Sequence, residues 1–170
     1  MNENTLTPNE LAVIALCKEY CELMARADGT IPTGEFVAQL CKLLPRIYIC
    51  ANDLPADDTA DDDIPMALDE ITYDTVRATI AALIGENDTY LDVFVEDMKY
   101  SESPILCTIS ENLADLYQEF YDFLAAAAFA TTEEQHRLTG ALRARFTARW
   151  AQTLCNVMRP LNDLSLTSIS

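Results

Sequence analysis

The sequence predicts an all-α fold, a single-domain helical bundle of about six helices. Its 170 residues are the length of one ordinary domain, and half of them are apolar, which is enough for one packed core. Apolar residues recur at helical spacing along most of the chain. Only 4 glycines and 7 prolines leave few residues for the tight turns of a many-stranded sheet. We expect one domain over residues 1–170, with its core at about 8–162 and a frayed tail at about 165–170.

A capping box starts the first predicted helix. Thr7 is a suitable N-cap, Pro8 fits the first helical position, and Glu10 stands three residues after the cap. Apolar residues then repeat at helical spacing until Asp28 and Gly29 end the run. They are Val13, Leu16, Cys17, Tyr20, Met24 and Ala27.

The second predicted helix is followed by an acidic segment. Its apolar stripe continues past Pro45, which removes one backbone hydrogen bond and predicts a bend. The stripe consists of Phe36, Leu40, Leu43, Leu44 and Ile47. Between about 52 and 71 the chain has two prolines, no base and many acids, without the spacing of a calcium-binding loop. We therefore predict a loop that like-charge repulsion keeps in solvent.

Helical spacing resumes at Thr72 and stops at Gly85. A short apolar segment follows from Asp88 to Asp97, and a second polar connection is expected near 99–107. This part of the chain therefore predicts one helix between two connections.

Two long helices complete the chain. Thr108 with Glu111 and Thr132 with Gln135 match capping boxes, and the last apolar seam ends at Pro160. Antiparallel neighbours joined by a short connection pack their apolar faces together. We therefore expect the apolar face of the first of these helices to be buried against the apolar face of the second. The residues are Leu113, Leu116, Phe120 and Phe123 in the first helix, and Leu142, Phe146 and Trp150 in the second.

Charge is distributed unevenly along the chain. The 28 acids and 11 bases give a net charge of −17, so nucleic acids and anionic membrane surfaces would be repelled. No apolar run approaches the ~20 residues that span a bilayer, and the first residues lack the pattern of a secretory signal. We expect a cytoplasmic protein that binds neither nucleic acid nor membrane.

The last part of the chain is cationic, with 5 bases and 1 acid over residues 135–170. Guanidinium groups match carboxylate and phosphate geometry, so four arginines are candidates for binding an anion or an acidic partner. They are Arg137, Arg143, Arg145 and Arg149. Alternatively, they neutralise the protein's own acidic helices, for example the row Glu111, Asp115, Glu119 and Asp122. We favour neutralisation, and both interpretations remain open.

Six cysteines lie in apolar stretches, and we interpret them as reduced, buried thiols without a metal. They are Cys17, Cys21, Cys41, Cys50, Cys107 and Cys155. The only histidine, His136, follows two acids in a first helical turn, where a solvated side chain is expected. Glycine loops for phosphates are absent.

One arrangement of carboxylates predicts an alternative function. Glu19 with Glu22, and Glu119 with Asp122, each place two acids on one helical face. If the two pairs faced each other they could hold Mg²⁺, as in helical nucleotide pyrophosphohydrolases. About a hundred residues separate the pairs, and a chain with 28 acids contains such spacings by chance.

Four stretches of the chain resemble the bacterial family called domain of unknown function 5063. They are Leu40–Tyr48, Asp88–Met98, Ile109–Phe123 and Trp150–Leu154. The resemblance covers roughly residues 8 to 162 and rests on helical core and turn sequences. It implies an all-helical fold and carries over no catalytic residue.

These observations favour a non-catalytic protein-interaction or regulatory module over an enzyme. The sequence shows no recognisable nucleophile, metal cage or nucleotide loop, and it implies no cofactor. The expected partner is another protein. The alternative is the Mg²⁺-dependent nucleotide pyrophosphohydrolase.

Overall fold

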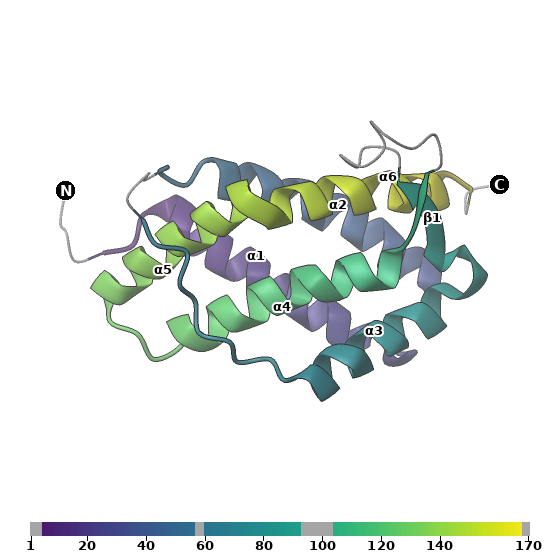
Figure 1. Ribbon diagram of the computed structural model, residues 1–170, viewed down its shortest axis with the longest axis horizontal. Helices are drawn as coiled ribbons and strands as arrows, with labels where there is room; N and C mark the ends of the chain where they lie inside the picture. Colours follow the sequence, from purple (N-terminus) through teal and green to yellow (C-terminus); the bar gives the residue numbers. More distant parts are fainter. Residues whose placement is uncertain (1–4, 57–59, 93–103, 168–170) are drawn as a thin grey trace.

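The protein is described by a computed structural model over residues 5–56, 60–92 and 104–167. Six α-helices and one two-stranded hairpin follow each other in the described part (Figure 1). They are α1 (Pro8–Ala25), α2 (Thr33–Asn52), α3 (Glu70–Ile84), β1 (Thr89–Asp92), β2 (Ile105–Thr108), α4 (Ile109–Ala127), α5 (Thr132–Arg145) and α6 (Ala151–Thr167). The predicted single helical domain is confirmed, and the hairpin is an addition to it.

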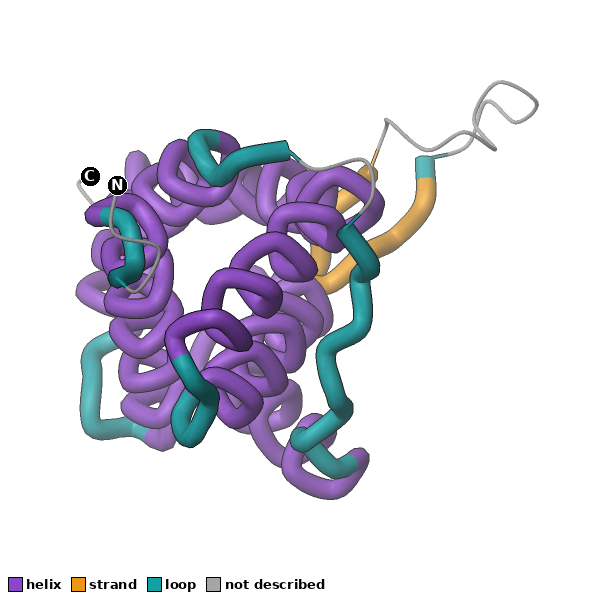
Figure 2. The backbone as a smooth tube through the Cα atoms, turned by 90° about the vertical axis from the view of Figure 1, so that its left-hand side faces the viewer, coloured by secondary structure: helices purple, strands orange, loops and turns teal. Residues whose placement is uncertain are grey.

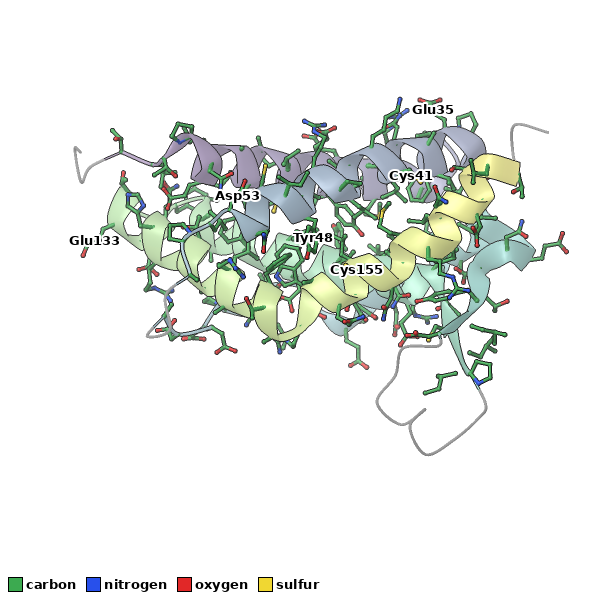
Figure 3. The ribbon with its side chains drawn as sticks, turned by 90° about the horizontal axis from the view of Figure 1, so that it is seen from above. Glu35, Cys41, Tyr48, Asp53, Glu133 and Cys155 are labelled. Atoms are coloured by element: carbon green, nitrogen blue, oxygen red, sulfur yellow. The ribbon has the colours of Figure 1, made fainter. Side chains whose placement is uncertain are left out.

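Four long helices form the body of the molecule. Helix α1 packs against α2 and α4, and α6 packs against the same two helices, so the four enclose one core. Helix α3 lies against α4 on the outside of this arrangement. A view from above shows α6 alongside α2 (Figure 3). The ring of Tyr48 in α2 also meets that of Phe146, which precedes α6 in the chain, with centroids 5.2 Å apart.

The predicted seam between the last two long helices is confirmed. Both sets of residues are buried, and the rings of Phe120 and Trp150 meet edge to face with centroids 5.1 Å apart. The Trp150 indole Nε1 donates to the carbonyl of Leu142 at 3.2 Å. The Tyr20 hydroxyl likewise donates to the carbonyl of Leu113 at 2.7 Å, so these buried polar groups are hydrogen-bonded.

The first helix begins as predicted, with both hydrogen bonds of the Thr7–Glu10 capping box present. Two other predicted starts are displaced. Helix α3 begins at Glu70 because Asp69 accepts from the Thr72 amide, and α5 is capped by Thr131 rather than Thr132. In each case a preceding side-chain oxygen reaches the third amide of the helix.

Two prolines lie inside continuous helices. Helix α2 continues through Pro45, and α6 continues through Pro160 to Thr167. The predicted tail is therefore helical as far as residue 167, and residues 168–170 lie outside the described part. A π-helical turn over Phe146–Trp150 joins α5 to α6, so the two run on as one helix.

The hairpin replaces part of a predicted connection. Strands β1 and β2 are antiparallel, with Leu91 opposite Leu106, and they stand at one edge of the helical body (Figure 2). The expected connection near 99–107 is thus a strand from Ile105 onward, and the expected apolar segment after Asp88 is β1 as far as Asp92. Residues 93–97 of that predicted segment lie outside the described part.

The acidic segment is a loop, as the sequence predicts, but it packs against the helices through its apolar side chains instead of standing free in solvent. We call residues 53–56 and 60–69 the strap, because this segment connects α2 to α3 and runs across the outside of the helices. Its apolar side chains, Leu54, Ile64 and Leu68, are buried. The Asp122 carboxylate accepts from the amides of Ala67 and Leu68 at 2.8 Å each. Apolar burial and these hydrogen bonds outweigh the like-charge repulsion, which acts only between exposed acids.

No helix in the described part is long and apolar enough to cross a membrane.

Candidate functional site

Arg137 binds the strap from the first half of α5. Its Nη2 donates to Glu134 at 2.7 Å, and its Nη1 donates to the carboxylate of Asp61 at 3.0 Å and to the carbonyl of Asp63 at 3.1 Å. The hydrogen bond from Arg137 lowers the pKa of Glu134. This arginine therefore has three partners within the protein.

Arg145 binds the strap further along the same helix. It donates to the carbonyls of Asp62 and Ile64 at 2.7 and 3.3 Å, and to the Glu119 carboxylate of α4 at 3.1 Å. Arg149 lies 3.6 Å from the other oxygen of Glu119. One carboxylate of α4 thus serves two arginines.

Arg143 completes the row. It donates to the carbonyl of Leu54 at 3.3 Å and to the hydroxyl of Thr147, and its guanidinium lies 5.2 Å from the centre of the Phe146 ring. All four arginines singled out in the sequence therefore contact the protein itself. Within the expected acidic row of α4, only Glu119 pairs with them in the described part, and most other partners are strap carbonyls.

The two carboxylate pairs of the hydrolase alternative have separate partners. Glu19 lies 3.7 Å from Arg46 of α2, and Glu22 is exposed. Glu119 is bound by arginines, and the buried Asp122 holds the strap. No group of three or more histidine, cysteine or acidic side chains in the described residues could hold a metal ion.

His136 is not the solvated side chain that its position predicts. Its Nδ1 lies 2.7 Å from Oε1 of Glu10, and the Thr139 hydroxyl donates to the same oxygen at 2.8 Å. Burial raises the pKa of Glu10, but hydrogen bonds from Thr7, His136 and Thr139 together lower it below its ordinary value. This cluster joins α1 to α5 and leaves the buried carboxylate fully hydrogen-bonded.

The cysteines differ from the prediction in burial. All six are free thiols, but only Cys17 is buried, and Cys155 of α6 is exposed (Figure 3). Burial raises the pKa of Cys17 and raises that of Cys21 to about 12, so neither forms a thiolate readily at neutral pH.

A pocket with an acidic lining lies where the strap enters α3. Its volume is about 280 Å³, and we call it the acidic pocket. It is lined by Met66, Leu68, Asp69, Glu70, Tyr73, Asp115 and Gln118. The charged side chains in this lining are all acidic, and no arginine or lysine of the described residues contributes to it. Sequence reasoning did not single out this pocket, because its residues come from three elements.

Asp115 is a carboxyl of the acidic pocket with a raised pKa. Burial raises its pKa, and the nearby carboxylates of Glu111 and Glu119 raise it further. The Tyr73 hydroxyl donates to it at 2.6 Å, which opposes the rise. The charged form of Asp115 is therefore held in unfavourable surroundings, which a cation would improve.

Comparisons with known proteins agree with this architecture. The chain matches the model of DUF5063, a domain of unknown function, over residues 4–167. The chain belongs to this family. Protein BF1032 from Bacteroides fragilis, a crystal structure, is 28% identical and matches with a TM-score of 0.76 over 92% of each chain. A search of curated proteins found no match. The resemblance seen in the sequence is confirmed, and it carries over the fold without an activity.

Proposed function

We propose that this DUF5063 protein is a non-catalytic protein-interaction module, and that its acidic pocket binds a basic and apolar segment of a partner protein. One observation carries the proposal. Met66 is 79% exposed in the lining of a pocket whose charged side chains are all acidic. Large apolar side chains next to uncompensated charge are typical of interaction surfaces.

Charge complementarity defines the partner. Asp69, Glu70 and Asp115 line the pocket together. Burial raises the pKa of Asp115, and repulsion from Glu111 and Glu119 of α4 raises it further. A lysine or arginine side chain would relieve this repulsion and would be attracted by the net charge of −17.

Apolar burial supplies the second part of the interaction. Covering Met66 would contribute up to about 1.5–3 kcal/mol if burial were complete. The unbranched methionine side chain adapts to partner surfaces of different shape. A helix with cationic and apolar faces fits both requirements.

The test uses two synthetic amphipathic helices of 18 residues, one of leucine and lysine and the other of leucine and glutamate at the same positions. We expect the lysine helix to bind at low salt and the glutamate helix not to bind, measured by fluorescence anisotropy. Met66→Gln should weaken binding about tenfold. Asp115→Asn should weaken it and reduce its salt dependence.

Phe129→Gln is the matched control, because Phe129 is 99% exposed and is not part of the acidic pocket. It should leave the affinity unchanged. Equal binding of both helices, no binding of either, or equal loss in the control would overturn the proposal.

We also propose that the protein works in the cytoplasm. All six cysteines are free thiols, which reducing conditions preserve. Protein isolated from its native cell without reductant and alkylated after denaturation should carry six modified cysteines by mass spectrometry. An intramolecular disulfide would contradict this location.

A further inference from the structure

One side of helix α3 is exposed along most of its length, on the outside of the helical body (Figure 1). Ile80 and Ile84 are buried on the side that packs against the rest of the protein. The Tyr73 hydroxyl contacts Asp115 of α4 from that same side. Exposed residues recur every three or four positions on the opposite side, so they share one helical face. We call this the outer face of α3, and it consists of Ile71, Thr75, Ala78 and Ala82.

The outer face carries no charge, although the chain has a net charge of −17. Its one hydroxyl, that of Thr75, donates to the carbonyl of Ile71 at 2.8 Å. The neighbouring Thr79 hydroxyl donates in the same way to the carbonyl of Thr75 at 2.7 Å. Another protein could therefore cover this face without burying a charge or an unpaired hydroxyl.

Ile71 protrudes from the first turn of α3. Its side chain is 81% exposed, so it contributes little to the core. A single exposed isoleucine is common on protein surfaces and does not by itself indicate a contact. The cavity beside the same helix is the second observation.

This cavity lies between the second half of α3 and a short 3₁₀-helix, η1 (Arg26–Asp28). We call it the hollow, and its volume of about 650 Å³ is ample for an isoleucine side chain. Of the described residues that line it only Asp28 is charged, and its carboxylate accepts from the amide of Thr30 at 3.1 Å. The lining consists of Ala27, Asp28, Gly29, Thr75, Ala78, Thr79, Ala82 and Leu83.

The positions of Ile71 and of the hollow suit an antiparallel pair of α3 helices. The hollow adjoins Ala78 and Ala82, about 13 Å further along the helix than Ile71 at 1.5 Å per residue. A twofold axis beside Thr75 would place Ile71 of each copy next to Ala78 and Ala82 of the other. Such an interface requires both complementary parts on one chain, and α3 carries both.

We propose that the outer face of α3 binds the same face of a second copy of this chain, with Ile71 of each copy inserted into the hollow of the other. Two helices of 15 residues bury less than the ~1,200 Å² of an ordinary stable interface, so this dimer is weak and reversible. Salt should strengthen it, because the contact is apolar and the two copies repel each other through their net charge. Binding of a basic helix to the acidic pocket should instead weaken in salt, so the two proposals are tested separately.

The test is sedimentation velocity from about 10 μM to about 1 mM protein, at low and at moderate salt. We expect the sedimentation coefficient to rise with concentration, and to rise more at moderate salt. Ile71→Ala shortens the inserted side chain and Ala82→Phe fills the hollow, and each should weaken association at least about tenfold. Both positions are exposed, so the melting temperature of the monomer should stay the same.

Ile49→Ala is the matched control, because Ile49 is a 59% exposed isoleucine of α2 outside the hollow. It should leave association unchanged.

Mixing the two variants tests the exchange of side chains. A dimer of Ile71→Ala with Ala82→Phe keeps one unaltered contact, and its other contact joins the shortened side chain to the filled hollow. The mixture should therefore associate more strongly than either variant alone, measured with one of the two fluorescently labelled. A monomer at every concentration, association weakened by salt, equal loss in Ile49→Ala, or a mixture no stronger than its components would overturn the proposal.

Discussion

The strap and the hairpin are both connections between helices, but they are attached in opposite ways. The strap buries Leu54, Ile64 and Leu68 and is held by arginines through its backbone carbonyls. The hairpin is held by side-chain hydrogen bonds to Asn112 of α4 and Asn156 of α6, and it exposes Leu91 and Leu106. Apolar residues that face the core contribute to stability, whereas those that face solvent are available to a partner.

The attachment of the hairpin begins at Asp88. Its buried carboxylate accepts from the amide and from the hydroxyl of Ser110 at 2.7 and 2.6 Å. Asp122 performs the same task for the strap by accepting from two amides. The two regions therefore share one kind of polar anchor, and the difference between them lies in their apolar side chains.

The largest effect is expected in the core that supports both regions. Phe120→Ala should lower the free energy of unfolding by about 3–5 kcal/mol, because it removes a fully buried ring from contact with Trp150. Urea unfolding followed by circular dichroism measures this. An unchanged midpoint would mean that α4 and the last helix are not paired as described.

Matched substitutions in the two regions test the comparison directly. Ile64→Ala in the strap should cost about 2 kcal/mol, since it leaves a space in a buried contact. Leu106→Ala in the hairpin should change the free energy of unfolding by less than about 0.5 kcal/mol. The same urea titration measures both, and equal costs would show that the two regions are attached alike.

The sequence predicts the helices of this fold well because their signals are local. The Thr7–Glu10 capping box and the spacing of Leu113, Leu116 and Phe120 fix elements and faces without knowledge of distant residues. The attachment of the strap has no such signal, since Arg145 binds backbone carbonyls that any residue supplies. The strands are four residues each, too short for a reliable alternation pattern.

The candidate sites were harder to predict for the same reason. The arginine row was visible as a charge pattern, but its partners come from the strap, many positions earlier in the chain. The acidic pocket combines the strap, α3 and α4, and only the three-dimensional arrangement joins Met66 to Asp115. One available signal was the apolar pair Ile64 and Leu68, whose presence among acids is unusual for a solvated linker.

Glu10, which lies outside both regions, and Asp115, which lies beside the strap, should affect the free energy of unfolding with opposite pH dependence. The pKa of Glu10 is below its ordinary value of 4.5, so its stabilising contribution is present at neutral pH and is lost as the pH falls through its folded-state pKa. Glu10→Gln should cost about 1–2 kcal/mol at pH 7 and much less in acid.

Asp115 has a raised pKa, so its ionisation opposes folding as the pH rises through the range between its unfolded and folded pKa values. Asp115→Asn keeps an oxygen for the Tyr73 hydroxyl and should raise the free energy of unfolding slightly at pH 7. Urea titrations at pH 7 and pH 4 measure both variants. A loss of stability in Asp115→Asn at pH 7 would show that its charge is compensated in the folded protein.

The smallest effects are expected from single arginines, and they separate attachment of the strap from binding of a ligand. Arg145 holds two strap carbonyls and Glu119, whereas Arg149 contacts Glu119 alone among the described residues, at 3.6 Å. Arg145→Gln should therefore lower the melting temperature by about 2–4 °C, which corresponds to about 1 kcal/mol in a chain of this length. Arg149→Gln should have a smaller effect that moderate salt removes, because exposed ion pairs contribute ~0–1 kcal/mol.

The same melts are repeated with phosphate and with nucleotides at low salt. Because the guanidinium groups already have partners within the protein, we expect no rise in the melting temperature of the wild type. If the row instead served an external anion, each substitution would leave stability nearly unaltered, since like charges repel one another until the ligand binds. Suppose that nucleotide raises the melting temperature of the wild type and that Arg145→Gln abolishes this rise. The arginines would then be interpreted as an anion-binding site and not as neutralising groups. The strap would then be a segment that the anion displaces, and the contrast with the hairpin would no longer hold.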